Sequence, residues 1–332
     1  MRSSQAELTV LFSSAGRRVA LMECFRDAAA AMGVGLRVVA VDVRPELSAA
    51  CAVADRALPV SRCADPGFVA EIADIVRAER VRLIVPTIDT ELAVYAAARV
   101  QLRETGAWVS ISAPEVVAMA RDKLATWERL ASSGIAVART ATLETVRAQR
   151  ATFPGPVIVK PRGGSASIGL RVLRSTDELG AEQGEDVDGD LIVQEHLTGP
   201  EYTVNLFFDR AGVLRSVIPH RRIEVRAGEV SKACTVRDAR LIVQATRVAE
   251  LLPGAVGSLC YQAIDVGPGD EPRLIELNAR FGGGYPVAHR AGAPFARWLL
   301  EEALGHAPSV GGMTDWREGV TMLRYDAAVF SS

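Results

Sequence analysis

The sequence predicts an α/β domain with a parallel sheet, followed by an α+β region with antiparallel strands. Two observations predict this order. From Leu8 to Ile111, short apolar runs alternate with helix-period segments, as in parallel sheets with right-handed crossovers. From Val157 onward, apolar runs follow one another across short turns such as Asp209–Gly212, which is typical of antiparallel hairpins.

The first part of the chain supplies strands and helices in alternation. Buried strands are expected at Leu8–Phe12, Leu36–Val41, Arg82–Val85 and Trp108–Ile111. Helices are expected at Arg17–Met32, Pro66–Arg80 and Thr90–Thr105, the second capped by Asp65 because Pro66 suits a first turn. The segments Ser13–Arg18 and Pro86–Glu91 follow strands. We expect both at the carboxyl ends of the strands, where parallel sheets bind ligands.

The second part begins after a stretch of helix and linker from Pro114 to Gly134, with Asp122 as N-cap and Gly134 as stop. A helix is expected at Ala239–Leu252, and the turn Gly267–Pro272 joins the last two strands. The strands expected in this part are Val157–Lys160, Leu170–Leu173, Leu191–Gln194, Tyr202–Phe208, Leu214–Val225, Val230–Thr235, Tyr261–Val266 and Arg273–Leu277.

Composition indicates a globular enzyme of two or three domains, with 332 residues of which 49% are hydrophobic. A net charge of −2 gives no reason to expect a nucleic-acid partner. Five scattered cysteines and four isolated histidines favour reduced thiols in the cytoplasm over a disulfide framework or a zinc site. The beginning of the chain lacks a signal-peptide layout, and no apolar run approaches the roughly twenty residues of a membrane span. We therefore expect no membrane partner.

The most informative segment is Leu274–Gly284. In a strand, Glu276, Asn278 and Arg280 point to the same face. A carboxylate, an amide oxygen and a guanidinium in one row can bind a hard cation and steady a transferring phosphoryl group. Asp265, one hairpin earlier, is expected on the same face, which would complete an oxygen cage for Mg²⁺. The alternatives are a solvated sheet edge and exposed carboxylates.

Two further segments have the composition of a nucleotide site. Lys160 ends a strand and precedes a glycine- and serine-rich hairpin up to Gly169, which suits close backbone approach to phosphate oxygens. The order of a Walker A loop is absent. Gln194–Glu201 lies between two strands, so its backbone could meet an adenine edge and Glu201 could hold ribose hydroxyls. The alternatives are a tight turn and a polar strand connection.

Together these residues resemble the ATP-grasp superfamily, most closely its members similar to the carbamoyl-phosphate synthase large chain. The resemblance runs from Ser13–Arg18 to Leu274–Gly284, nearly the whole chain. It implies a Rossmann-like pre-ATP-grasp domain at 1–113, a small lobe or lid with linker helices at 114–195, and a large lobe with the metal and catalytic residues at 196–332.

The resemblance also implies roles for individual residues. Arg280 and Lys232 would be catalytic, and Asp265, Glu276 and Asn278 would bind one or two Mg²⁺, or Mn²⁺ instead. Many family members have glutamate where Asp265 stands, so this shorter side chain would reach the metal with one oxygen or through water. The residues implied in ATP binding are Lys123, Lys160, Gly164, Ser165, Ser167, Gly169, Gln194, Glu195, Leu197 and Glu201.

The reaction implied is ADP-forming C–N ligation, in which ATP activates a small-molecule carboxylate as an acyl-phosphate that an amine attacks. Bicarbonate or carbamate phosphorylation is the first alternative, and non-catalytic nucleotide binding is an alternative of another class. The resemblance allows a homodimer. Substrate contacts are expected from Arg17, Arg18, Asp89, Glu91, Arg221 and Arg222, and from His220 beside the last pair. Surface charges or salt bridges within the fold are the alternative for each.

Overall fold

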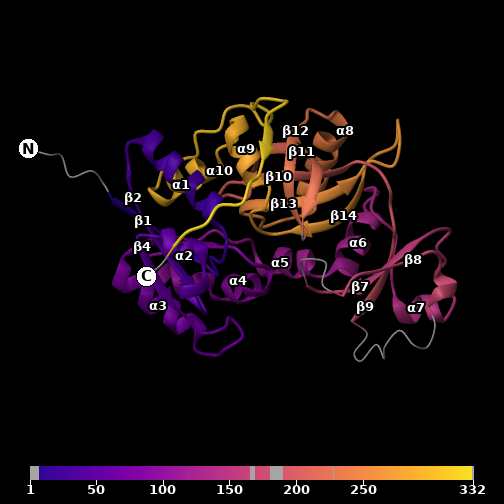
Figure 1. Cartoon of the computed structure of the whole chain (residues 1–332), viewed down its shortest axis with the longest axis horizontal. Coiled ribbons are helices and arrows are strands. Elements are labelled where there is room, and N and C mark those ends of the chain that lie inside the picture. Colours follow the sequence, from indigo (N-terminus) through magenta and orange to yellow (C-terminus); the bar gives the residue numbers. More distant parts are fainter. Residues whose placement is uncertain (1–6, 165–168, 180–189, 227, 331–332) are drawn as a thin grey trace, which may run out of the picture.

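The computed structural model describes residues 7–164, 169–179, 190–226 and 228–330. Within them the chain forms a five-stranded, a four-stranded and a six-stranded sheet. The five-stranded sheet lies at one end of the molecule, the four-stranded sheet at the other, and the six-stranded sheet between them (Figure 1). The predicted ligand residues Ser165 and Ser167 fall outside the described residues.

The first sheet is parallel throughout, as the sequence predicts, and its strand order is β3-β2-β1-β4-β5. Its elements are β1 (Glu7–Ser13), α1 (Val19–Met32), β2 (Gly35–Asp42), α2 (Ala49–Val53), β3 (Arg56–Pro59), α3 (Phe68–Glu79), β4 (Val81–Pro86), α4 (Asp89–Glu104) and β5 (Trp108–Val109).

Two details of this domain differ from expectation. The edge strand β3 is unpredicted because its side chains are mostly exposed and form no apolar run. Helix α3 begins at Phe68 with Gly67 as N-cap, so the predicted cap at Asp65 is wrong. The Asp65 carboxylate instead accepts a hydrogen bond from the backbone N–H of Arg62.

Both faces of the parallel sheet are buried, which explains its nearly continuous apolar strands. Leu8, Val10 and Phe12 of β1 belong to a core shared with α1 and with the late helices α9 (Tyr285–Ala291) and α10 (Phe295–Ala303). Leu11 of β1 faces the other way, into a core shared with α3 and α4. Helices α9 and α10 therefore complete the hydrophobic core that β1 and α1 form in the first domain.

The four-stranded sheet is antiparallel where its strands pair, in the order β6-β9-β7-β8. Helices α5 (Pro114–Arg121) and α6 (Lys123–Ser132) lead into it, and the Asp122 carboxylate caps α6 as predicted, by accepting from the N–H groups of Leu124 and Ala125. The remaining elements are β6 (Thr140–Thr142), α7 (Leu143–Arg147), β7 (Val157–Pro161), β8 (Arg171–Leu173) and β9 (Leu191–Glu195).

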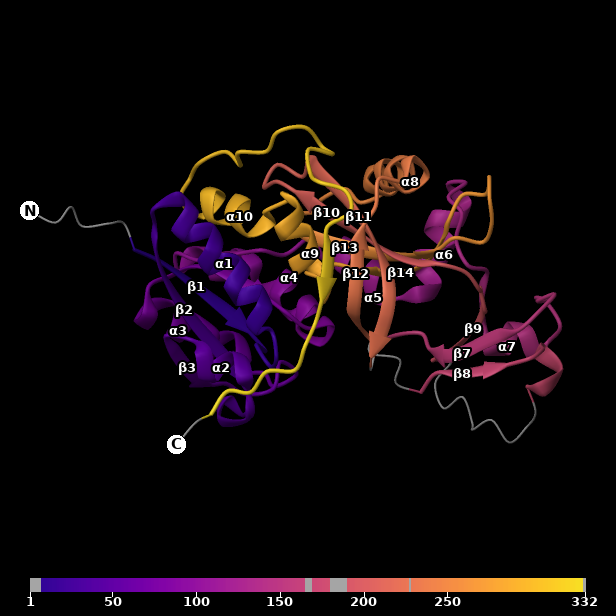
Figure 2. The same ribbon diagram turned by 45° about the horizontal axis from the view of Figure 1, so that its top comes forward.

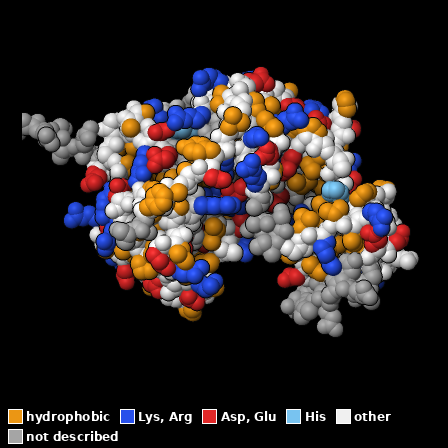
Figure 3. Space-filling view, viewed as in Figure 1, with side chains coloured by type: hydrophobic (Ala, Val, Ile, Leu, Met, Phe, Trp, Pro, Cys, Tyr) orange, Lys and Arg blue, Asp and Glu red, His pale blue; other side chains and the backbone are white. Residues whose placement is uncertain are grey.

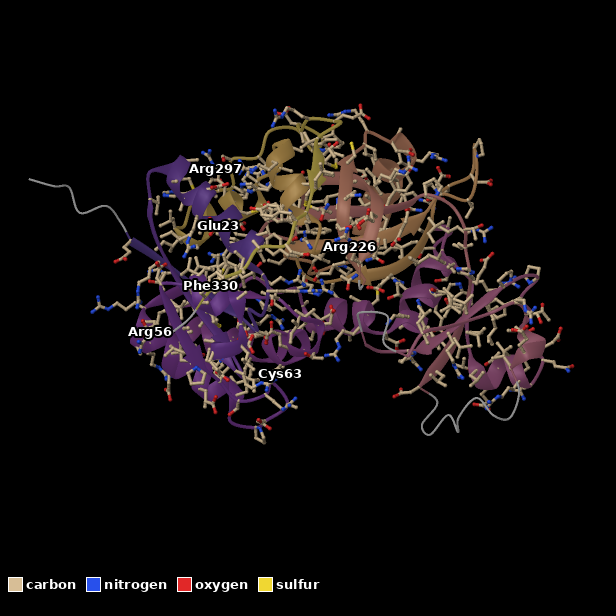
Figure 4. The ribbon with its side chains drawn as sticks, in the orientation of Figure 1. Glu23, Arg56, Cys63, Arg226, Arg297 and Phe330 are labelled. Atoms are coloured by element: carbon tan, nitrogen blue, oxygen red, sulfur yellow. The ribbon has the colours of Figure 1, made fainter. Side chains whose placement is uncertain are left out.

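The six-stranded sheet is also antiparallel, in the order β14-β13-β10-β11-β12-β15. Helices α9 and α10 and strand β15 are unpredicted. The last described residues after β15 run back across the parallel-sheet domain in both ribbon views (Figures 1 and 2), and Phe330 lies over that domain (Figure 4). The elements are β10 (Glu201–Phe208), β11 (Leu214–Arg226), β12 (Glu229–Thr235), α8 (Ala239–Glu250), β13 (Gly257–Ile264), β14 (Arg273–Asn278) and β15 (Thr321–Leu323).

Among the described residues, none of the helices combines the length and the apolarity that crossing a bilayer requires.

An aromatic cluster joins the six-stranded sheet to the late helices. The fully buried Phe207 ring lies 5.3 Å from the Phe295 ring and 5.0 Å from the Trp298 ring. We expect Phe207→Ala to destabilise the protein by about 3–5 kcal/mol, because truncating a buried Phe loses transfer energy and leaves a cavity. Thermal unfolding measures the change. Phe330→Ala is the control, because Phe330 is 93% exposed. Equal midpoints for the two variants would contradict the cluster's role.

Candidate active site

The predicted row on β14 is present and internally hydrogen-bonded. Asn278 Nδ2 donates to Glu276 Oε1 at 2.8 Å, and Arg280 Nη2 donates to Asn278 Oδ1 at 3.2 Å. Each side chain fixes the rotamer of its neighbour. The row is therefore pre-organised along the strand end.

Arg280 reaches across to the parallel-sheet domain and forms a two-pronged ion pair with Asp89. Its Nε and Nη2 atoms donate to the two carboxylate oxygens at 2.9 and 2.6 Å. Both side chains are largely buried, with exposed fractions of 13% and 16%. Burial opposes the charge of Arg280, but the neighbouring Asp89 carboxylate outweighs it and raises the pKa of Arg280. Asp89 thus positions the guanidinium, and its substrate contact stays a prediction.

Glu91 is fully buried, which makes the predicted substrate contact wrong. Its carboxylate accepts from the Ser13 and Ser14 hydroxyls at 2.6 and 2.7 Å. It also accepts from the backbone N–H groups of Thr87 and Ile88 at 2.6 and 3.3 Å. Burial raises the pKa of Glu91, and these four donors oppose that effect. The side chain ties together the two rim loops that follow β1 and β4.

Two cavities meet at the β14 row. One, of about 230 Å³, we call the arginine cavity; its lining includes Arg17, Arg18, Arg222 and Arg280. The other, of about 270 Å³, we call the lysine cavity; its lining includes Lys123, Gly163 and Gly164. Asp89, Glu276 and Asn278 line both cavities. Basic and acidic side chains lie side by side on the central face of the molecule (Figure 3).

Of the predicted phosphate-binding residues, Lys123 and Gly164 line the lysine cavity, and Lys160 lies near Lys123 and Glu276 beside it. Lys123 Nζ donates to the carbonyl of Gly164 at 2.8 Å, and Lys160 Nζ donates to Gln194 Oε1 at 2.7 Å. Burial lowers the pKa of Lys160 to about 8; Glu276 opposes this shift and Lys123 adds to it. A buried ammonium beside a second cation is well suited to receive an anion. Gly164 and Gly169 both adopt positive φ, which a side chain would strain.

The connection between the two antiparallel sheets carries the other predicted nucleotide residues. Gln194 is buried; its amide oxygen accepts a hydrogen bond from Lys160, and its amide nitrogen donates one to the Thr140 hydroxyl. The carboxylate of Glu195 accepts from Arg273 at 2.7 Å and so links β9 to β14.

Leu197 is partly buried in the same connection. Glu201 lies 3.1 Å from Arg222. Burial raises the pKa of Glu201 and Arg222 opposes this, while nearby Glu276 raises it further. The side chains of Gln194 and Glu195 bind protein partners, which leaves the backbone of these residues for the predicted adenine contact.

The strand register makes the predicted metal role of Asp265 wrong. Gln262, not Asp265, lies opposite Glu276. Asp265 follows the end of β13, where its carboxylate pairs with Arg240 at 2.8 Å. The sequence carries no alternation signal for Gln262, because its position opposite Glu276 depends on the pairing of β13 with β14.

Lys232 is likewise absent from the described lining of both cavities. Its ammonium pairs with Glu224 at 2.6 Å, and the side chain is 44% exposed. The catalytic contact of Lys232 therefore stays a prediction.

Of the two adjacent arginines on β11, only Arg222 lines the arginine cavity. Arg221 is exposed, because successive residues of a strand face opposite sides, so its predicted substrate contact is wrong. His220 is fully buried, and its Nδ1 atom lies 3.1 Å from Asn205 Nδ2. Burial lowers the pKa of His220 to about 3, which keeps it neutral and away from any role as a charged substrate contact.

Glu229 pairs with two other arginines of the cavity, Arg17 and Arg18, and with Arg324 beside them. Its carboxylate lies 3.3 Å from Arg17, 3.9 Å from Arg18 and 3.0 Å from Arg324. Arg18 also donates to the carbonyl of Thr87 at 3.2 Å. Glu229 and Arg324 belong to no recognised motif, so no sequence pattern indicates them.

The oxygen atoms at this site are suited to one cation that is bound jointly by the protein and by phosphates. They are less suited to a cation bound by protein ligands alone. The described residues contain no group of three or more His, Cys, Asp and Glu side chains placed to hold a metal. Glu276 supplies one carboxylate, and Asn278 and Gln262 supply amide oxygens beside it. Mg²⁺ is commonly bound by one or two carboxylates together with substrate phosphates, and this donor set meets that requirement.

Comparison with family models identifies the two main parts of the chain. Residues 120–284 match an ATP-grasp domain, and residues 10–110 match a PylC-like N-terminal domain. The chain belongs to the ATP-grasp superfamily, and the family and fold class expected from the sequence are confirmed.

Curated relatives and solved structures agree with this assignment. A D-alanine–D-alanine ligase of Geobacter sulfurreducens is 28% identical over 174 residues, which are 48% of this chain and 55% of the relative. One from Cereibacter sphaeroides is 31% identical over 103 residues, 30% of this chain and 33% of the relative. The chain thus spans about half the length of the first relative and a third of the second.

The similar structures show the fold. The biotin carboxylase domain dimer of Hydrogenobacter thermophilus 2-oxoglutarate carboxylase, in complex with MgADP, ADP and bicarbonate, has a TM-score of 0.71 at 18% identity. That match covers 94% of this chain and 73% of the other. N5-carboxyaminoimidazole synthetase from Staphylococcus aureus has a TM-score of 0.68 at 14% identity, covering 92% and 79%.

The four hydrogen bonds to Glu91 give a stability prediction. Glu91→Ala leaves four donors of the rim loops without this acceptor, and a buried unsatisfied donor costs roughly 1–3 kcal/mol. We expect a loss of about 3 kcal/mol or more in chemical denaturation. Glu104→Ala, at the exposed end of the same helix, should be close to wild type. A Glu91→Ala protein as stable as the Glu104→Ala protein would contradict this role.

Proposed function

We propose that the protein is an ATP-dependent ligase that activates a small-molecule carboxylate as an acyl-phosphate and joins it to an amine, with release of ADP and phosphate. The observation that carries the proposal is the β14 row, which lines the lysine cavity on one side and the arginine cavity on the other. A terminal phosphate in the first cavity and a carboxylate in the second would meet at that row.

The lysine cavity is the proposed place of the triphosphate. Lys123 and Lys160 would contact phosphate oxygens, and the glycines of the β7–β8 hairpin allow close backbone approach. The adenine would lie against the backbone of the segment from Glu195 to Leu197. Glu201 would hold the ribose, for which its partly buried carboxylate is suited.

Glu276, Asn278 and Gln262 would hold Mg²⁺ together with the phosphates. When bound, the cation neutralises phosphate charge and favours departure of the terminal group. One cation is the number that the protein ligands support best, because only one carboxylate is present among these three residues.

The arginine cavity is the proposed place of the carboxylate substrate. A carboxylate oxygen attacks the γ-phosphorus and the bond to the β,γ-bridging oxygen breaks, giving an acyl-phosphate and ADP. The amine nitrogen then attacks the acyl carbon, phosphate leaves with the bonding electron pair, and the nitrogen loses a proton. Arg280, fixed by Asp89, would stabilise the charge on the acyl-phosphate and on the tetrahedral state. Arg18 and Arg222 would orient the carboxylate.

A phosphate-release screen tests the proposal. Purified protein, ATP and Mg²⁺ are mixed with paired amino acids and small carboxylates, and Glu276→Ala serves as the blank. We expect release that depends on one acid and one amine, reduced at least a hundredfold by Glu276→Ala. Release that depends on bicarbonate alone would favour the bicarbonate alternative. Nucleotide binding without turnover on any pair would favour a non-catalytic role.

Assembly as a homodimer and a cytoplasmic location stay predictions.

The lowered pKa of Lys160 gives a pH prediction. If the charged form binds phosphate, nucleotide affinity is full below pH 8 and weakens as the pH rises through about 8, because the free lysine loses its proton there. Well above that pH we expect the Kd to rise by up to about tenfold per pH unit. Titration of a nucleotide between pH 6.5 and 9.5 measures this dependence.

Lys160→Arg is the matched control, because arginine stays charged over this range. The inflection near pH 8 should disappear in that variant. An unchanged inflection, or a wild-type Kd that is flat across the range, would exclude Lys160 as the group responsible.

A further inference from the structure

The structure contains a third, larger cavity at the opposite end of the parallel sheet from the candidate active site. Its volume is about 660 Å³, within the range of small-molecule sites. It shares no described lining residue with the arginine or lysine cavity. Arg82, one of its lining residues, lies at the amino end of β4. The rim loop Pro86–Glu91 of the candidate active site follows the carboxyl end of the same strand.

Four arginines converge on this cavity, which we call the distal cavity. They are Arg82 from β4, Arg99 and Arg103 from α4, and Arg210 from the turn after β10. No aspartate or glutamate is among its described lining residues. In the described part of the chain, none of these four guanidinium groups forms an ion pair, although most other arginines near carboxylates do. The described lining of the cavity is thus strongly cationic.

The surroundings of Arg210 show that the arginines act on one another. Its guanidinium lies over the Trp108 ring, 4.0 Å from the centroid, at the wall of the cavity. Burial lowers the pKa of Arg210, Glu302 opposes this, and Arg103 and Arg82 lower the pKa further. The nearest carboxylate, Glu302, accepts from the backbone N–H of Arg210 at 2.7 Å. Burial raises the pKa of Glu302 to about 7, so near neutral pH it offsets the arginines only in part.

We propose that the distal cavity is a binding site for a small molecule with several anionic groups, either phosphates or carboxylates. Guanidinium groups match both with two parallel hydrogen bonds, and four of them around one cavity suit a ligand with at least two such groups. The cavity lies where α4 and β5 of the first domain meet Arg210, Gly254 and the end of α10. Its ligand would therefore bridge the parallel-sheet domain and the large lobe.

Isothermal titration with inorganic tripolyphosphate and, separately, citrate tests the site. The test variant is Arg99→Ala/Arg103→Ala, which removes two cavity arginines from one helix. The charge-matched control is Arg77→Ala/Arg147→Ala, which removes two exposed helical arginines outside the cavity. A Lys123→Ala/Lys160→Ala variant separates binding in the lysine cavity from binding in the distal cavity. Circular dichroism confirms that each variant is folded.

We expect the Arg99/Arg103 variant to bind at least one probe at least tenfold more weakly than wild type, with the Arg77/Arg147 control within twofold. The probe that loses affinity distinguishes a phosphate ligand from a carboxylate ligand. Equal losses in the two arginine variants would indicate general charge attraction and overturn the proposal. A loss confined to the lysine variant, or no binding of either probe to wild type, would overturn it as well. None of these outcomes depends on the ligase activity.

Discussion

The arrangement of the candidate active site depends on one buried ion pair, that between Asp89 and Arg280. The two residues come from different domains and lie 191 positions apart in the chain. Removing one partner of a buried pair leaves an uncompensated charge and is strongly destabilising. Both partners must therefore be in place for the β14 row to hold its geometry, because Arg280 also holds Asn278 and Asn278 holds Glu276.

Two further carboxylates stabilise the segments around that pair. Glu91 joins the two rim loops of the parallel sheet, with hydrogen bonds to both. Glu195 pairs with Arg273 and so attaches the four-stranded sheet to the strand that carries the row. A residue that a sequence pattern predicts to bind a ligand can instead have a structural role. This occurs because the loops around a ligand also need hydrogen-bond partners within the protein.

Sequence reasoning predicted the order of the sheets and the row on β14 because both depend on local periodicity. Apolar alternation and the capping carboxylate of Asp122 are readable without knowledge of partners. The roles of Asp265 and Arg221 were wrong because each depends on cross-strand register or on which face a strand presents. A shift of one residue moves a side chain to the other face. Gln262 and Glu229 could not be found, because their contacts arise only from tertiary pairing.

The position of Asp89 at the first residue of α4 also limits how this architecture can be recombined. A chimera that takes its N-terminal domain from a relative would need an acidic residue at the equivalent helix start, at a distance that reaches the incoming guanidinium. Without it, the foreign domain could fold and dock, yet Arg280 would be free to swing away from the row. Domain exchange in such chains is therefore constrained by this side chain as well as by the complementarity of the two surfaces.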